Sequence, residues 1–189
     1  MFQVRFHGRG GQGVVTAAEL LSVAAFLDGR HAQAFPSFGS ERTGAPVVAF
    51  CRVHDRAIRS HEPILRPDAV VIQDPTLLHQ VDVFGGLRAD GVVILNTARR
   101  LDELGLAELR DRLPAGHVHT VAASELAREH LGRPMPGAPL LGALTAVTGI
   151  TSSSSLATAI RERFPGAVGE ANATAAEAAR LQLLEAVHA

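Results

Sequence analysis

Two continuous apolar runs lie in the middle of the chain, at residues 68–74 (DAVVIQD) and 91–96 (GVVILN). Uninterrupted Val, Ile and Leu of this length are typical of strands buried on both faces, as in a parallel sheet. Further strand patterns lie at 3–7, 31–35, 47–53 and 117–123. Helical patterns between them lie at 12–28, 101–113 and 124–131, and residues 75–88 have the length of a short helix and a return loop. After a loop at 132–139, the chain reads as helical, with helices at 152–164 and 170–188. This order predicts an α/β fold: a Rossmann-like, mostly parallel sheet flanked by helices, with a helical C-terminal tail.

Length and composition indicate one globular domain. The chain has 189 residues, of which 47% are hydrophobic and 20% charged, so we expect a single domain over residues 1–189. The net charge of −1 argues against binding to nucleic acid or to an anionic membrane. Since neither a signal-like segment nor an apolar run long enough to span a bilayer is found, we expect a cytoplasmic protein.

The cysteine and histidine content excludes several kinds of site. The single cysteine, Cys51, cannot ligate an iron–sulfur cluster alone, and its apolar surroundings (VVAFCRV) predict a buried, inert thiol. His117 and His119 alternate along a predicted strand, which is more typical of a solvated strand face than of a metal pair. His7 ends the first predicted strand, where it could meet a ligand or make a local hydrogen bond. We therefore expect no metal ligands.

Gly8, Gly10 and Gly13 fit the pattern G-x-G-x-x-G between a predicted strand and a predicted helix. In this pattern the first glycine makes a tight turn, the second lets the backbone approach a phosphate, and the third lets the helix pack closely on the strand. A glycine turn that binds nothing is the alternative. NAD would require an acidic residue at the tip of the second strand, but Asp28 precedes that strand and the strand ends as AFPS. The loop thus predicts a phosphate site and argues against NAD.

A second loop, PSFGSERTGAP at 36–46, follows the second predicted strand. Loops that follow parallel strands meet at one edge of the sheet, so we expect this loop beside the glycine loop. Arg42 could then face the same anion as Arg9, since arginine pairs well with phosphate. The alternative, which stays open, is that Arg42 pairs with Glu41 or with a partner chain.

The two loops together carry a resemblance. RFHGRGGQGVVTAAELL (5–21) followed by AFPSFGSERTGAPVVAFCRV (34–53) resembles the gamma subunit of the pyruvate/2-oxoacid:ferredoxin oxidoreductase family, and LLGALTAVTGI (140–150) resembles a later family segment. The resemblance implies a subunit that is inactive alone, in an enzyme that oxidatively decarboxylates a 2-oxoacid to an acyl-CoA and reduces ferredoxin. It also implies alpha, beta and ferredoxin-like delta partner subunits that carry thiamine diphosphate and iron–sulfur clusters. The apolar helix 12–28 and the Ala-rich helix 170–188 are expected to pack on such partners.

The resemblance further implies which residues contact ligand. Residues of both loops would face the phosphates of coenzyme A: Gly8, Arg9, Gly10, Gly11, Gln12 and Gly13 in the first, and Ser40, Glu41, Arg42 and Thr43 in the second. No catalytic residue is expected. The family often has Asn at the position that Gly137 occupies here. Three alternatives stay open: a gamma-type subunit for an aryl 2-oxoacid (phenylglyoxylate or indolepyruvate), an NAD(P) dehydrogenase, or a non-catalytic nucleotide-binding assembly module.

Overall fold

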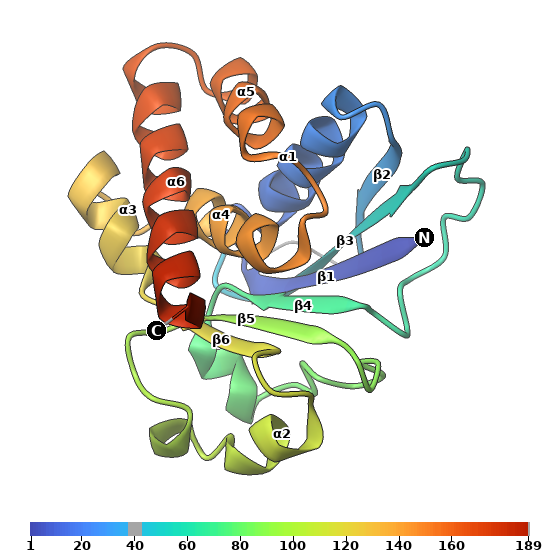
Figure 1. The fold of residues 1–189 in the computed structure, drawn as a ribbon, viewed down its shortest axis with the longest axis vertical. Helices are drawn as coiled ribbons and strands as arrows, with labels where there is room; N and C mark the ends of the chain where they lie inside the picture. Colours follow the sequence, from blue (N-terminus) through green and yellow to red (C-terminus); the bar gives the residue numbers. More distant parts are fainter. Residues whose placement is uncertain (38–42, 189) are drawn as a thin grey trace.

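The computed structural model describes residues 1–37 and 43–188 and contains a six-stranded sheet (Figure 1). The strands are β1 (Phe2–Arg9), β2 (His31–Pro36), β3 (Pro46–His54), β4 (Ala69–Ile72), β5 (Val92–Asn96) and β6 (Val118–Val121). Their order across the sheet is β2-β3-β1-β4-β5-β6. Each falls on a segment predicted as a strand, and the Rossmann-like, mostly parallel fold is confirmed.

Strand β3 is the exception to the parallel arrangement, because it runs antiparallel to both β1 and β2. The physical reason is the connection before it. A parallel return needs a crossover of about a dozen residues or more, usually helical, whereas the loop between β2 and β3 spans only residues 37–45. Strand β2 consequently points the same way as β1, and both end at the same edge of the sheet.

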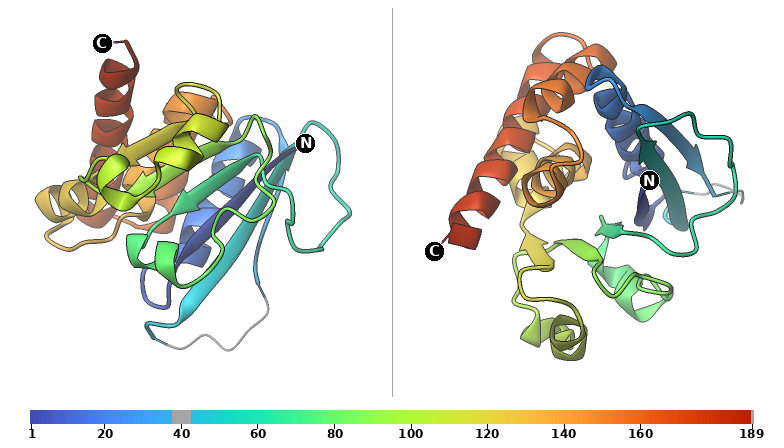
Figure 2. Two further views of the ribbon diagram at one scale, coloured as in Figure 1. Left: turned by 90° about the horizontal axis from the view of Figure 1, so that it is seen from below. Right: turned by 45° about the vertical axis from the view of Figure 1, so that its right-hand side comes forward.

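Helices cover both faces of the sheet (Figure 2). One face carries α1 (Val14–Leu27), α3 (Ala123–Leu131), α4 (Gly137–Thr148), α5 (Ser153–Arg163) and α6 (Ala167–His188) over the larger hydrophobic core. The other carries the 3-10 turns η1 (Pro75–His79) and η2 (Asp102–Leu104) and helix α2 (Ala107–Arg112) over a smaller cluster. The segment predicted as one helix at 101–113 is broken at Gly105, whose φ of 69° lies in the left-handed region.

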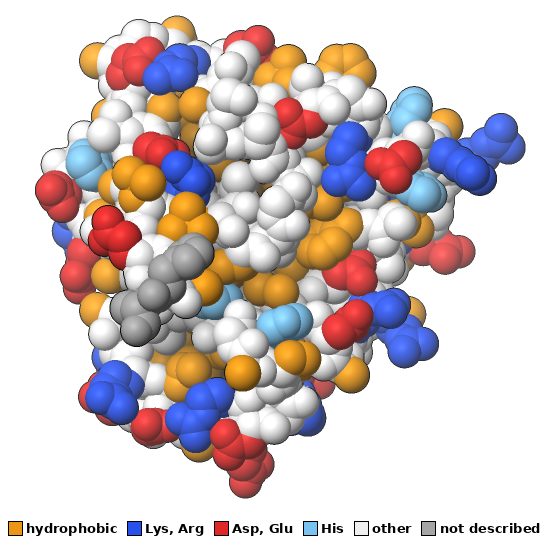
Figure 3. All heavy atoms as spheres, in the orientation of Figure 1, with side chains coloured by type: hydrophobic (Ala, Val, Ile, Leu, Met, Phe, Trp, Pro, Cys, Tyr) orange, Lys and Arg blue, Asp and Glu red, His pale blue; other side chains and the backbone are white. Residues whose placement is uncertain are grey.

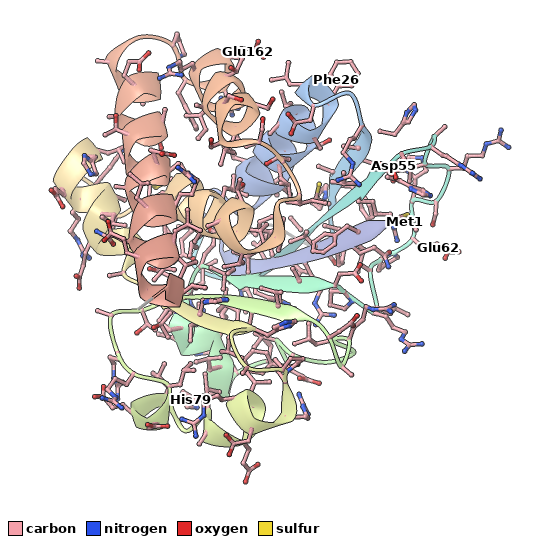
Figure 4. The ribbon with its side chains drawn as sticks, viewed as in Figure 1. Met1, Phe26, Asp55, Glu62, His79 and Glu162 are labelled. Carbon is pink, nitrogen blue, oxygen red and sulfur yellow. The ribbon has the colours of Figure 1, made fainter. Side chains whose placement is uncertain are left out.

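The apolar helices bury many of their residues within the chain itself, and their expected packing on partner chains stays a prediction. Helix α1 buries seven residues (Val14, Ala17, Ala18, Leu20, Leu21, Ala24 and Ala25) among α4, α5 and strands β1 to β3. Helix α6 packs closely on α4, where a Cβ on Gly142 would overlap the carbonyl of Ala176. The exposed apolar side chains of α1 are Val23, Phe26 and Leu27 near its C-terminal end, of which Phe26 is 71% exposed (Figure 4).

Two further sequence predictions can be checked in the structure. Cys51 is buried, as predicted, and burial raises the pKa of its thiol. Helix α5, predicted at 152–164, is capped by Ser152, whose hydroxyl accepts the Ser155 N–H at 3.1 Å. The solvated face expected for His119 is wrong: its side chain is buried, its Nε2 has no hydrogen bond in the structure, and burial lowers its pKa.

The surface shows no field of a single sign on the side drawn in Figure 3, where acidic and basic side chains intermingle. Within residues 1–37 and 43–188, no helix is both long enough and apolar enough to cross a membrane.

Candidate functional site

The glycine loop connects the end of β1 to the start of α1. Gly11 has a φ of 93° and Gly13, the residue that precedes α1, has a φ of 73°. Both values lie in the left-handed region, which glycine adopts without steric cost. Among the described residues no side chain caps α1, and its first turn contains no acidic residue. The free N–H groups and the positive end of the helix dipole therefore favour an anion at this place.

Glycine is required at position 8 for a steric reason and not for its backbone conformation. A Cβ built on it would lie 2.6 Å from Val14 Cγ2 and 3.3 Å from the Cβ of Gln73. The absence of a side chain thus lets α1 start directly above β1, which sets the position of the loop.

A cavity of about 300 Å³ opens at this helix start. It is lined by Arg9, Gly10, Gly11, Gly13, Val14, Val15, Thr16, Val47 and Met135. We call it the loop cavity. Four of the predicted first-loop residues (Arg9, Gly10, Gly11 and Gly13) line it, whereas Gly8 and Gln12 do not.

The second loop returns beside the first, as predicted. Gly10 N–H donates to the Ala45 carbonyl at 2.9 Å, and Gly44 N–H donates to the Gly10 carbonyl at 3.2 Å. Thr43 forms an isolated bridge with Gly10 and is exposed next to the loop cavity's wall. Ser40, Glu41 and Arg42 lie outside the described residues, so their predicted part in the site stays a prediction.

Arg9 is held by neighbouring residues on several sides. Its guanidinium lies 3.2 Å from the Asp74 carboxylate and donates to Thr76 Oγ1 at 2.7 Å and to Gln80 Oε1 at 2.9 Å. It also donates to the Gly44 carbonyl at 3.0 Å. Arg9 therefore joins the first loop, the second loop and η1, and its charge is already paired with a carboxylate.

Asp74 is a residue of this site that the sequence reasoning missed. Its carboxylate accepts hydrogen bonds from Gln12 Nε2 at 2.8 Å, from Thr76 N–H at 2.9 Å and from the Thr76 hydroxyl at 2.6 Å. Gln12 in turn accepts the Arg9 N–H at 2.8 Å. Burial raises the pKa of Asp74, but the hydrogen bonds from Thr76 and Gln12 and the charge of Arg9 outweigh it and lower the pKa overall. Asp74 follows a buried strand and precedes Pro75, which is a typical sequence signal for a helix N-cap. This signal could have predicted that Asp74 lies at the edge of the sheet where the glycine loop lies.

His7 lies below the loop in β1 and does not line the loop cavity. Its Nε2 accepts a hydrogen bond from Arg5 Nε at 3.0 Å. Arg5 also donates to the carbonyls of Val83 at 3.0 Å and Gly85 at 2.7 Å. Burial lowers the pKa of His7 to about 3, and the positive charge of Arg5 acts in the same direction. Of the two roles left open for His7, the structure shows the local hydrogen bond.

The arrangement at the loop cavity is suited to binding. Backbone N–H groups, glycines and an already paired arginine face it, together with the apolar side chains of three valines and a methionine. Among the described residues no group of three or more His, Cys, Asp or Glu side chains could hold a metal ion. The loop cavity can therefore bind an anionic group that belongs to a partly apolar molecule.

Comparison with known proteins identifies the family. Residues 3–182 match the family model described as pyruvate ferredoxin/flavodoxin oxidoreductase. The chain is 49% identical to the pyruvate synthase subunit PorC of Methanothermobacter marburgensis over 95% of this chain and 96% of that one. It is also 49% identical to the pyruvate/ketoisovalerate oxidoreductases common subunit gamma of Thermococcus kodakarensis, over 95% of each chain.

Solved structures agree with this. The crystal structure of pyruvate oxidoreductase subunit PORC from Thermotoga maritima has a TM-score of 0.80 and 35% identity, covering 95% of each chain. A 2-oxoglutarate:ferredoxin oxidoreductase from Magnetococcus marinus, with 2-oxoglutarate, coenzyme A and succinyl-CoA bound, shares the fold with a TM-score of 0.73 at 18% identity, over 98% of this chain and 31% of that one. The chain therefore belongs to the pyruvate ferredoxin/flavodoxin oxidoreductase family, as a gamma-type subunit of such an enzyme.

Proposed function

We propose that this gamma subunit binds the phosphates of coenzyme A in the loop cavity. The observation that carries the proposal is the uncapped first turn of α1, which opens on that cavity behind two glycines with positive φ. Anions are favoured at such a helix start by both the free N–H groups and the helix dipole. The Magnetococcus marinus enzyme, which has coenzyme A bound, contains a part with this fold.

The subunit would act within a larger enzyme that oxidatively decarboxylates a 2-oxoacid to an acyl-CoA and passes the electrons to ferredoxin. In this proposal alpha, beta and ferredoxin-like delta subunits supply the thiamine diphosphate and the iron–sulfur clusters, and the gamma chain is inactive alone. Thiamine diphosphate supplies the decarboxylation chemistry when bound to its own subunit. The residues of this chain bind and orient the acyl acceptor.

The 2-oxoacid pocket would lie on another subunit. Support comes from the relative in Thermococcus kodakarensis, whose name describes a gamma subunit common to pyruvate and ketoisovalerate oxidoreductases. A subunit shared by enzymes for two different 2-oxoacids has no reason to contact the part in which those acids differ. Coenzyme A is the substrate that both reactions would share.

Calorimetric titration of the full chain with coenzyme A tests the proposal. Gly11→Val places a branched side chain on the wall of the loop cavity, and Gly29→Val is its matched control at the opposite end of α1. Both glycines have positive φ (93° and 77°) and open space around the Cβ position, so the backbone strain is comparable. We expect Gly11→Val to weaken binding of coenzyme A and Gly29→Val to leave it unchanged. No binding by the wild type, or equal effects of the two variants, would contradict the proposal.

Arg42 provides a second test in the assembled enzyme. If its guanidinium contacts a phosphate, Arg42→Ala removes a charge-assisted hydrogen bond worth about 1.5–3 kcal/mol, or roughly 10- to 150-fold in affinity. The loss should appear as a higher KM for coenzyme A with the KM for the 2-oxoacid unchanged. Dissociation of the variant complex on a sizing column, with normal coenzyme A kinetics, would instead assign Arg42 to a subunit contact.

A further inference from the structure

Strand β2 forms one edge of the sheet, and no strand among the described residues pairs with its outer side. Just after β2, the Ser37 N–H donates to the Val48 carbonyl at 2.8 Å. Residues along an antiparallel pair alternate between positions that bond to the neighbouring strand and positions that do not. Every second residue of β2, counted back from Ser37, therefore bonds to β3. Ala32 and Ala34 lie between these positions and point their N–H and C=O groups to the outer edge.

This edge carries little of the protection that sheet edges usually have. Charged side chains, proline, bulges and very short strands are the common ways to keep an edge from pairing with another chain. Strand β2 pairs with β3 over six residues without a bulge, contains no Asp, Glu, Lys or Arg, and has its one proline at the end, at Pro36. The opposite edge strand, β6, is four residues long. Of the two edges, β2 is therefore the better template for a further strand.

The helix that packs on this strand presents apolar side chains to solvent. Val23, Phe26 and Leu27 of α1 are exposed. Helix α1 packs on α4, on α5 and on the sheet, including β2, so these side chains lie on the side that those contacts leave open. Figure 4 labels Phe26 at the end of α1, shortly before the chain enters β2. Exposed apolar side chains grouped beside an open sheet edge are typical of a protein–protein contact.

The same surface has no unpaired charge of its own that would repel a copy of itself. Helix residues 20–27 and strand residues 31–36 contain no Asp, Glu, Lys or Arg. Of the charged residues between them, Asp28 accepts hydrogen bonds from the start of α5, and Arg30 forms an ion pair with Asp55. Two copies can therefore approach through this surface without a charge penalty from α1 or β2.

We propose that β2 and the end of α1 bind a second copy of this chain, strand to strand. With a two-fold axis at Gln33, Ala32 pairs with Ala34 of the second copy, and the four outward N–H and C=O groups of each copy are all bonded. Such an axis runs perpendicular to the sheet, so the α1 helices of both copies lie on the same face and their exposed apolar ends cover each other. A lone strand of another protein would pair with the backbone but leave the end of α1 in water.

Sedimentation equilibrium of the full chain tests this inference. Ala34→Pro removes an outward N–H, which an edge strand tolerates because that group is not used within the chain. Thr120→Pro is the matched control on the other edge: β6 accepts hydrogen bonds from β5 and the residue after it at the His117 and Val121 carbonyls, so Thr120 points outward. We expect a wild-type dimer whose dissociation constant rises on the order of tenfold or more in Ala34→Pro and is unchanged in Thr120→Pro.

A second pair of variants tests the end of α1. Phe26→Glu places a charge in the proposed contact, and Val187→Glu makes the same kind of change at an exposed position on α6. Phe26→Glu should weaken the dimer and Val187→Glu should leave it intact, with thermal unfolding checking the fold of each variant. A dimer that Ala34→Pro and Phe26→Glu both leave intact, or that the control variants weaken equally, would overturn the inference.

Hydrogen exchange of the wild type gives a measurement that needs no variant. The amides of Ala32 and Ala34 should exchange more slowly as the concentration of the chain rises, because dimerisation places them in hydrogen bonds. A chain that stays monomeric, with exchange of these amides independent of concentration, would overturn the inference. Protection that appears only when other subunits are added would overturn it too, and would assign the edge to a strand of another subunit.

Discussion

The buried His7 makes the stability of the chain depend on pH in a way that can be calculated. Burial and the neighbouring Arg5 lower the pKa of His7 to about 3 in the folded chain, from an ordinary value of 6.5. As the pH falls below 6.5, the unfolded chain binds a proton that the folded chain does not bind until about pH 3. The free energy of unfolding therefore decreases by about 1.4 kcal/mol per pH unit within that window. Above it, His7 is neutral in both states and contributes no pH dependence.

Carboxylates make the free energy of unfolding depend on pH at low pH as well. The effect of His7 is therefore best measured between about pH 7.5 and about pH 5. Over it, His7 accounts for a loss of about 2 kcal/mol. His7→Gln keeps a carbonyl that can accept the hydrogen bond from Arg5 but cannot titrate. Denaturant unfolding at several pH values should show that the variant loses about 2 kcal/mol less than the wild type.

His31→Gln, a substitution of the same kind at an exposed position, is measured alongside as the control variant. If the pH profiles of His7→Gln and the wild type are parallel, His7 is not held neutral by burial, and the account of the Arg5–His7 pair is refuted.

Four other outcomes are expected. Asp74→Ala removes the hydrogen-bond acceptor shared by Gln12, Thr76 and Arg9, and should lower the free energy of unfolding in denaturant by about 1–3 kcal/mol. It should also weaken the binding of coenzyme A, and an unchanged affinity would show that the glycine loop keeps its shape without Asp74. Gly8→Val should destabilise by about 1–3 kcal/mol or more through its clash with the start of α1, and a wild-type melting temperature would contradict this. Asp28→Ala removes the carboxylate at the end of α1 that accepts hydrogen bonds from Ser152 and Ser155 at the start of α5, and should lower the free energy of unfolding by about 0.5–2 kcal/mol. A smaller decrease would show that these hydrogen bonds between α1 and α5 do not stabilise the fold. Cys51 should react with a thiol reagent only after unfolding, so rapid labelling of the native chain would contradict its burial.

Much of the fold could be predicted from the sequence because its signals are local. The apolar runs at 68–74 and 91–96 became the interior strands β4 and β5, since a strand buried on both faces has few polar positions. The glycine pattern at 8, 10 and 13 placed the turn between β1 and α1, and in the structure Gly13 has the left-handed backbone and Gly8 the close strand–helix contact that require glycine. The meeting of the two loops at one edge also followed, since β1 and β2 point the same way.

The tertiary structure decided what depends on contacts between distant residues. Gln12 and Asp74 are 62 positions apart, and no local pattern shows that they share a hydrogen bond or that Arg9 is already paired. His119 lies in an alternating pattern that is typical of solvent exposure, yet it is buried. A second cavity is lined by residues of α1, α4 and α6 together with Phe164 and Met135, and only the packing of these elements brings Asn172 near the glycine loop. The sequence alone therefore determined where the backbone turns and which segments form the sheet, because those signals act over a few residues. Which side chains are already paired and which remain free for a ligand was decided by packing, because pairing depends on proximity in space.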